Sequence, residues 1–389
     1  MGSTEPILQK VLGVGIIGCG EVCQTVHLPT LGHLSDYFQV TYLCDVSSDA
    51  LQHCKKKVAG QEPETTRDVA TLCASPSVDV VFITNSNEYH AAHAIIALQH
   101  NKHVLLEKPA SITIRDADAI VAAESKSRGK VFVGYMRRYA AAFVDAIEEI
   151  GSVEKILYAR VRVDIIGPNH IFVDQSGTFP KKFSDFAPAD TEDIVNRNTE
   201  LLTQALEVEC GVEQTDRSKR FWRILGGLGS HDLSAMRETL GMPTSVKGVS
   251  YNFPFWNVLF QYPGFAVSYE SGMDQVPRFD AHIEIYSAKK TVRVQYDTPY
   301  VKGLPTTLHI CENVNGAYKE SMIRRTYEDP YTLEIMELYK MIVEGKQIKT
   351  TAADAKKDLE IFGMIMRAGF PVLDSSKVKS NGYAVQDGC

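Results

Sequence analysis

The chain has 389 residues, 44% hydrophobic and 23% charged, and carries a formal net charge of -7 at pH 7. This length exceeds what one ordinary hydrophobic core accommodates, so we expect two domains. A mildly acidic, evenly mixed charge distribution argues against nucleic acid or an anionic membrane as the partner. A small-molecule substrate is therefore expected.

The cysteines and the N-terminal segment bear on the compartment in which the protein works. Eight cysteines are spread through the chain without a CxxC pair, and the first ten residues, MGSTEPILQK, lack the apolar core of a secretion signal. No apolar run approaches the roughly 18 residues that a membrane-spanning helix needs. We expect a cytoplasmic protein with no membrane partner.

The first third of the chain alternates strand-like and helix-like segments. The strand-like runs are rich in β-branched residues and read VLGVGIIG, VTYLCD, VDVVFITN, HVLLEKP and VFVGYM. Nearly continuous apolar strands joined by longer, helical stretches predict a parallel sheet covered on both faces. We expect an α/β fold with a Rossmann dinucleotide-binding domain over residues 1–135.

From about residue 155 the pattern changes to alternating apolar and polar residues. Turns are expected at YPGF and SAKK, which predicts a large open, mainly antiparallel sheet in a C-terminal α+β domain over residues 136–389. This domain is expected to bind the substrate and to mediate oligomerisation. Helical spacing favours helices near 191–209, 330–345 and 352–368.

The first predicted strand runs into the stretch GCGEVC. Gly18 and Gly20 allow a tight turn and a close approach of the backbone to a pyrophosphate, which the N–H groups of the following helix favour. The loop residues predicted to contact the cofactor are Gly18, Cys19, Gly20, Glu21 and Val22. Cys23 replaces the third glycine of the usual pattern, so we expect a slightly shifted helix and retained binding. A turn without a nucleotide is the alternative.

Asp45 ends the second predicted strand. Its carboxylate can accept hydrogen bonds from the adenosine ribose hydroxyls, and it repels a 2′-phosphate. No Lys or Arg follows before Lys55. This favours NAD, with NADP the less favoured cofactor, although an acid at this place can also be a helix cap or a solvated residue.

The stretch NKHVLLEKPASI, with NSNEYHAAHAIIAL before it and VFVGYMRRYAAAF after it, resembles the Gfo/Idh/MocA oxidoreductases, the glucose–fructose oxidoreductase and inositol dehydrogenase family. The resemblance extends over nearly the whole chain. It implies an NAD(P)-dependent dehydrogenase or reductase that transfers a hydride between nicotinamide and a sugar-like, polyol or cyclic alcohol or ketone. It also implies a homodimer or homotetramer.

Lys108 is the first candidate catalytic residue. Pro109 disfavours a helical conformation for the residue before it, so Lys108 lies in an extended loop just past a buried strand, where parallel sheets bind ligands. By the resemblance this lysine lies between cofactor and substrate, where an amine can take the proton of an alcohol. A surface lysine is the alternative.

The same resemblance implies a further set of cofactor-binding residues: Asn85, Asn87, His90, Glu107 and Arg138. Asn85 and Ser86 stand where the family more often has Thr and Pro, so this loop is expected to be polar and less rigid. His90 could equally be the first turn of a helix, and Arg138 could form an ordinary ion pair.

His231, in GGLGSHDLSAMRETLG, is the second candidate catalytic residue, because imidazole exchanges protons near neutral pH. The family pattern puts an Asp four residues before this His, but Gly227 stands there. The departure leaves two alternatives open. One is a protein that retains NAD tightly for an internal redox cycle, and the other is a non-catalytic sugar-ligand sensor of the same fold.

Residues 164–222 form a long insert, which is expected to be a lid that sets specificity or an oligomer contact. The candidate substrate contacts are Tyr135, Asn169 and His170. His90 and His93 are three residues apart, as are His100 and His103, but cysteines or carboxylates at ligand spacing are missing, so no metal is expected. A serine hydrolase is also poorly supported, because no G-x-S-x-G stretch occurs.

Overall fold

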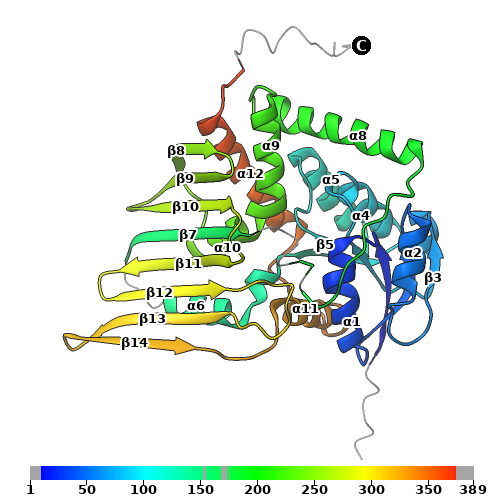
Figure 1. Ribbon diagram of the computed structural model, residues 1–389, viewed down its shortest axis with the longest axis horizontal. Coiled ribbons are helices and arrows are strands. Elements are labelled where there is room, and N and C mark those ends of the chain that lie inside the picture. Colours follow the sequence, from blue (N-terminus) through cyan, green and yellow to red (C-terminus); the bar gives the residue numbers. More distant parts are fainter. Residues whose placement is uncertain (1–9, 152–154, 168–172, 175, 374–389) are drawn as a thin grey trace, which may run out of the picture.

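The computed structural model describes residues 10–151, 155–167, 173–174 and 176–373. The chain forms a six-stranded sheet from its N-terminal part and an eight-stranded sheet from its C-terminal part, which lie side by side (Figure 1). This arrangement confirms the expected Rossmann fold followed by an α+β part with a mainly antiparallel sheet. The exact domain boundary at residue 135 stays a prediction.

All strand pairs of the N-terminal sheet are parallel, in the order β3-β2-β1-β4-β5-β6. The strands are β1 Leu12–Ile17, β2 Phe38–Cys44, β3 Glu64–Thr66, β4 Val80–Ile83, β5 His103–Glu107 and β6 Val131–Gly134. Strands β1, β4 and β6 are buried along their whole length because helices cover both faces. The strand order reverses between β1 and β4, and the carboxyl ends of such strands form a ligand crevice.

The helices of this part begin with a π-helical turn, η1, directly after the glycine loop. The elements are η1 Cys23–His27, α1 Leu28–His33, α2 Ser48–Lys55, α3 Val69–Ala74, η2 Asn87–Tyr89, α4 His90–Gln99 and α5 Ile114–Ser125. Their ends follow ordinary capping rules: the side chains of Ser47, Asp68 and Thr113 accept backbone N–H groups at the starts of α2, α3 and α5.

The C-terminal sheet has the order β14-β13-β12-β11-β7-β10-β9-β8, and only β7 and β10 pair in parallel within the described residues. The strands are β7 Ile156–Ile166, β8 Ser245–Asn252, β9 Phe255–Tyr262, β10 Phe265–Met273, β11 Phe279–Ser287, β12 Lys290–Tyr296, β13 Thr307–Val314 and β14 Ala317–Ile323. The turns at YPGF and SAKK lie where expected, between β9 and β10 and between β11 and β12. The hairpin of β13 and β14 was not predicted.

Helices α6, α10 and α12 cover one face of this sheet (Figure 1). The helical elements of this part are η3 Met136–Tyr139, α6 Ala141–Gly151, α8 Pro188–Thr203, η4 Gln204–Glu209, α9 Asp216–Ile224, η5 Leu225–Gly229, α10 Ser230–Leu240, α11 Pro330–Glu344 and α12 Ala352–Gly369. The three predicted helices therefore exist. Through the described part of the chain, every helix is too short or too polar to cross a bilayer.

The insert returns to the N-terminal part before α8 begins. The main chain of Lys181 pairs with the Gln24 side chain through two hydrogen bonds of 2.8 and 3.0 Å. Asp185 accepts hydrogen bonds from the Ser47 hydroxyl and, at 3.1 Å, from the Asp49 N–H. We name residues 178–185 the crossing segment. It lies against the glycine-loop helix and the start of α2, on the predicted cofactor side.

Candidate active site

The glycine loop is tight against β4 and open on its other side. Gly18 has a φ of +99°, and a Cβ there would lie 2.6 Å from the Asn85 nitrogen, so only glycine fits. A Cβ on Gly20 would meet nothing within 4 Å. The open space in front of Gly20, at the start of a helix, fits the pyrophosphate of a dinucleotide.

Asp45 lies directly behind this loop. Its carboxylate accepts the Cys19 N–H at 2.6 Å and the Ser47 N–H at 2.8 Å. Burial raises the pKa of Asp45 above its usual value, and the two N–H groups oppose that rise. The cap of α2 is Ser47, so the helix-cap alternative does not describe Asp45. Each carboxylate oxygen keeps a lone pair for a ribose hydroxyl.

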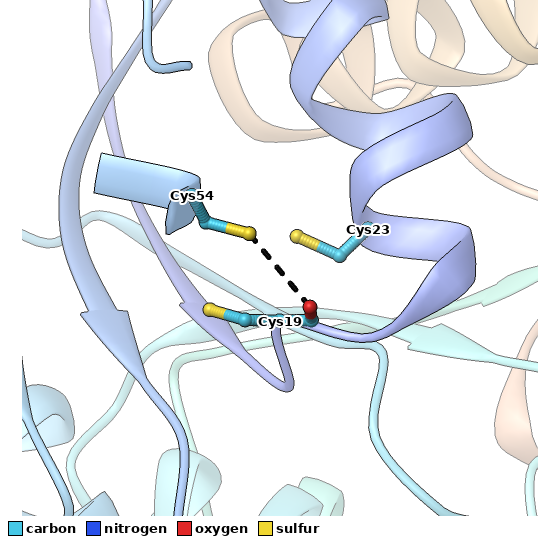
Figure 2. Close-up of side chains that lie close together, drawn as sticks. All are labelled: Cys19, Cys23 and Cys54. Atoms are coloured by element: carbon cyan, nitrogen blue, oxygen red, sulfur yellow. Dashed lines mark hydrogen bonds between the residues drawn. The ribbon is translucent and has the colours of Figure 1, made fainter. Parts of the chain in front are cut away.

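Three buried cysteines fill the space between the loop, η1 and α2 (Figure 2). The sulfurs of Cys19, Cys23 and Cys54 lie within 4.8 Å of one another, and the Cys54 thiol contacts the Cys19 carbonyl at 3.7 Å. Cys23 thus packs where a third glycine was expected, and the helix begins with the π-helical turn η1. No fourth His, Cys, Asp or Glu joins the three in the described residues, so they lack the four ligands of a structural zinc site.

Lys108 reaches across to the C-terminal part of the chain. Its amine donates to the Gly227 carbonyl at 2.6 Å, and its N–H donates to Glu107. Glu107 is buried against His27 at 2.8 Å. Burial works to raise the pKa of Glu107, but the His27 hydrogen bond and the nearby Lys108 charge outweigh it and lower that pKa. The Glu107 carboxylate is thereby held ionised behind the lysine.

His231 lies in the first turn of α10, four residues after Gly227, and is 8% exposed. Burial lowers its pKa well below the ordinary value, and the charges of Lys108 and Arg137 lower it further. Its Nδ1 has no hydrogen-bond partner among the described residues. The structure therefore brings Lys108 and a neutral imidazole to the same place. Their catalytic roles stay predictions.

His90 connects the loops that follow β4 and β5. Its ring nitrogens lie 2.8 Å from the Pro109 carbonyl and 3.1 Å from the Asn85 carbonyl, and it begins α4. The Asn85 side chain contacts His93 at 3.0 Å, and Asn87 begins η2. His90 thus holds together two loops at the carboxyl edge of the sheet, while contact of these residues with a cofactor stays a prediction.

Arg138 forms the ordinary ion pairs that the sequence left open as an alternative. Its guanidinium donates to Glu238 on α10 and to Asp354 on α12. Beside it, Arg137 pairs with Asp232, and both of these groups are buried. With these carboxylates as its partners, Arg138 ties η3 to α10 and α12, and a cofactor contact stays a prediction.

Tyr135 is 1% exposed, and its phenol hydrogen-bonds to Asp358. The side chain thus belongs to the buried junction, which gives no support to the predicted substrate contact. The other two predicted substrate contacts, Asn169 and His170, lie outside the described residues.

The structure adds residues that the sequence analysis missed. A cavity of about 520 Å³ adjoins Gly227, and α9 contributes Lys219, Arg220 and Arg223 to its wall. The spacing of basic residues in DRSKRFWRI was a usable signal for one charged helix face. Asp185 and its contacts with α2 had no local signal, because they depend on how the insert folds back.

A family model described as "Oxidoreductase family, NAD-binding Rossmann fold", GFO_IDH_MocA, matches residues 12–135. Residues 12–135 belong to this oxidoreductase family. The resemblance that the EKP stretch indicated is thereby confirmed for the N-terminal part.

Two relatives match about a third of the chain. Inositol 2-dehydrogenase of Salmonella typhimurium is 35% identical over 144 residues, which are 37% of this chain and 42% of that enzyme. Myo-inositol 2-dehydrogenase of Thermotoga maritima is 29% identical over 130 residues, 33% of this chain and 38% of that enzyme. The matches to these two relatives thus span less than half of each enzyme's length.

Solved structures share the fold over nearly the whole chain. The 3-ketoreductase KijD10 of Actinomadura kijaniata, in complex with NADP and TDP-benzene, has a TM-score of 0.68 at 14% identity and covers 94% of this chain and 100% of its own. Aldose-aldose oxidoreductase of Caulobacter crescentus, complexed with glycerol, has a TM-score of 0.67 at 17% identity, with 92% and 97% coverage. The C-terminal part therefore has the fold of these oxidoreductases as well.

Proposed function

We propose that the protein is an NAD-dependent oxidoreductase that interconverts an alcohol and a ketone on a sugar-like, polyol or cyclic substrate. The observation that carries the proposal is the contact between the Lys108 amine and the Gly227 carbonyl. It joins the loop after β5, at the predicted cofactor crevice, to the segment that presents His231. The named relatives that act on inositol support the same substrate class.

In this proposal a bound nicotinamide supplies the hydride acceptor or donor. The Lys108 amine exchanges a proton with the substrate oxygen, and the Gly227 carbonyl holds that amine in position. The neutral His231 imidazole orients the same oxygen through a hydrogen bond at its unpartnered Nδ1. Glu107, ionised and bonded to His27, fixes the backbone of the lysine loop.

Two carboxylates support NAD as the cofactor. The Asp45 carboxylate can accept hydrogen bonds from the ribose hydroxyls. Asp185 of the crossing segment adds a second negative charge at the start of α2. The Ser47 hydroxyl and the Asp49 N–H lower the pKa of Asp185, so it stays ionised. Helix N-termini attract anions, and a 2′-phosphate there would meet a place that a carboxylate already occupies.

The crossing segment also favours a second candidate function, in which NAD is retained through an internal redox cycle. Hydrogen bonds between the Lys181 main chain and the Gln24 side chain, and from Ser47 and Asp49 to the Asp185 carboxylate, hold the segment against the predicted cofactor side. Cofactor exchange would require this segment to move. Slow exchange suits a protein that oxidises and re-reduces one substrate without releasing its nicotinamide.

A spectroscopic experiment separates the candidates. Purified protein is mixed with NAD and a panel of sugars and polyols while the absorbance of reduced nicotinamide is followed. Steady accumulation supports the dehydrogenase, and a change that stops at one equivalent of enzyme supports the internal cycle. Tight NAD binding without any change supports a sensor, and absence of NAD binding would overturn the proposal as a whole.

A further inference from the structure

A cavity adjoins Gly227, the residue whose carbonyl accepts the Lys108 amine. Its walls are the ends of β7 and β10, the π-helical turn η5 and one face of α9. The lining residues are Ile166, Asp216, Lys219, Arg220, Arg223, Ile224, Gly227, Leu228 and Met273. A Cβ placed on Gly227 would meet nothing within 4 Å, so there is open space beside the residue whose carbonyl holds the Lys108 amine.

The charge of this cavity is strongly one-sided. Among its described lining residues, three cations stand against one carboxylate, although the whole chain carries a net charge of -7. The carboxylate, Asp216, is 96% exposed and lies 3.1 Å from Lys219 at the rim. Arg220 and Arg223 have no carboxylate partner in the described residues. A partly enclosed wall of one charge sign concentrates ions of the opposite sign.

The two arginines are held in position. The Arg220 guanidinium lies 5.0 Å from the centre of the Phe253 ring, and Arg223 donates to the Asn198 side chain. Neither contact neutralises the charge. A solvated helix face would leave such side chains free, whereas these are oriented on one side of α9 and keep further N–H donors for a ligand.

The other lining residues that the structure describes are apolar. Ile166 and Met273, from β7 and β10, and Leu228, from η5, provide a surface for carbon atoms. A ligand that fits this cavity therefore has a carbon skeleton and an acidic group. Guanidinium groups bind carboxylates and phosphates with paired hydrogen bonds, and both acids share that chemistry.

We propose that the substrate is an acidic polyol or sugar, whose carboxylate or phosphate binds Arg220 and Arg223 while a hydroxyl lies at Lys108. This inference rests on the proposed oxidoreductase function and adds the substrate class to it. The acidic group anchors the substrate at α9, and the reacting carbon lies across the cavity, beside the amine.

The test uses matched neutral and acidic probes. Glucose is compared with glucuronate and glucose 6-phosphate, and myo-inositol with myo-inositol 1-phosphate. Each is assayed by NAD reduction and, without turnover, by titration calorimetry. The variant is the double substitution Arg220→Gln with Arg223→Gln. The matched control is Arg217→Gln, because Arg217 lies on the same helix outside the cavity lining, and glutamine can still donate to the Tyr251 carbonyl.

We expect an acidic probe to have a KM at least about tenfold below that of its neutral partner, because hydrogen bonds to charged groups are strong. The double variant should raise that KM by about ten- to a hundredfold and leave the neutral probe within about twofold. The control should change neither. Glucuronate and glucose 6-phosphate together distinguish a carboxylate from a phosphate preference.

The outcomes separate the two proposals. Where turnover is seen, the oxidoreductase proposal holds. Equal KM values for neutral and acidic probes, or an equal rise of both KM values in the double variant, then overturn the acidic substrate. Without turnover, acid-selective binding that the double variant abolishes supports the anion site and contradicts the oxidoreductase. Absence of acid-selective binding in the calorimetry overturns the anion site in every case.

Discussion

The two walls of the candidate site are built on different principles. The cofactor wall depends on backbone geometry: Gly18 has a positive φ, Asp45 accepts two backbone N–H groups, and His90 contacts two carbonyls. The substrate wall depends on side chains around open space, with Gly227 beside a cavity lined by cations of α9. Backbone geometry restricts residue types, so the first wall keeps a family pattern. The second can change its chemistry without disturbing the fold.

The largest expected effect tests whether the walls work as one site. Lys108→Ala removes the group that connects them and should lower kcat by about 10²- to 10⁴-fold, the usual contribution of a proton-transfer group. NAD affinity should stay within a few-fold, because the glycine loop is untouched. Stopped-flow or steady-state absorbance of reduced nicotinamide measures the first, and fluorescence titration the second. Lys126→Ala, an exposed lysine, is the control, and near-normal turnover in Lys108→Ala would remove this residue from the mechanism.

The next effect is confined to the cofactor wall. Asp45→Ala should reduce the preference for NAD over NADP by about ten- to a hundredfold, because it removes a charged acceptor for the ribose and a repulsive charge. Asp185→Asn should shift the same ratio less, because the amide oxygen can still accept the Asp49 N–H while the amide N–H group can donate to the Ser47 hydroxyl oxygen. The ratio of kcat/KM for the two cofactors is the measurement. An unchanged ratio in both variants would show that another group reads the ribose.

The stability at acid pH tests histidines in both parts of the chain whose pKa is lowered by burial. Burial lowers the pKa of His93 and of His282 to about 4, and burial also lowers the pKa of His231. A folded-state pKa below the unfolded value means that the unfolded chain binds more protons, so stability is present above about pH 6.5 and is lost as pH falls toward 4. Each of these histidines should lower the free energy of unfolding by at most about 1.4 kcal/mol between pH 7.5 and 5.5.

Urea unfolding at the two pH values measures this loss. In His93→Gln, the free energy of unfolding should differ less between the two pH values, by the amount that His93 contributes. His33→Gln, an exposed histidine, should leave it unchanged. A pH difference identical in His93→Gln and in the original protein would contradict the assignment of that pKa.

The smallest effect is confined to the substrate wall. Gly227→Asp places a carboxylate in open space next to the cations of α9, and it should raise the KM for an acidic substrate by about three- to tenfold, of the order of a partly exposed ion pair. A neutral substrate should be unaffected or bind better. Gly227→Ala serves as the control for steric effects, because a Cβ meets nothing there. Equal KM changes for Ala and Asp would contradict the charge argument.

Much of the fold could be predicted from the sequence because local pattern and tertiary role agree. The five expected strands of the N-terminal sheet are continuous apolar runs, and burial on both faces is what such runs require. Strand β3 was missed because Glu64–Thr66 is three residues long and exposed or half-buried. It has no apolar run to detect.

The hairpin of β13 and β14 was missed despite a usable signal. Asn315 and Gly316 both have positive φ, 53° and 87°, and they join two alternating segments. An Asn-Gly pair between such segments is a strong hairpin signal. The strands were passed over because Ala317–Ile323 is mostly exposed, with polar residues that weaken its alternation.

The candidate site divides in the same way. Lys108 and His231 could be proposed as neighbours only through the family resemblance, because 119 positions separate Lys108 from its Gly227 contact. The anion-binding face of α9 and the contacts of Asp185 needed tertiary structure. A basic helix face is common in sequences and does not by itself indicate a ligand. The cavity beside this face is what indicates a binding site.

The ion pairs at the junction have a consequence for how the molecule melts. Arg138 joins the segment after β6 to α10 and α12, and Arg137 pairs with Asp232 nearby. Breaking a buried pair by removing one partner costs about 3–5 kcal/mol, so η3 cannot separate from α10 and α12 without a large loss of stability. Arg137→Met should therefore lower the melting temperature measured by calorimetry, because it removes the ion-pair partner of a buried carboxylate.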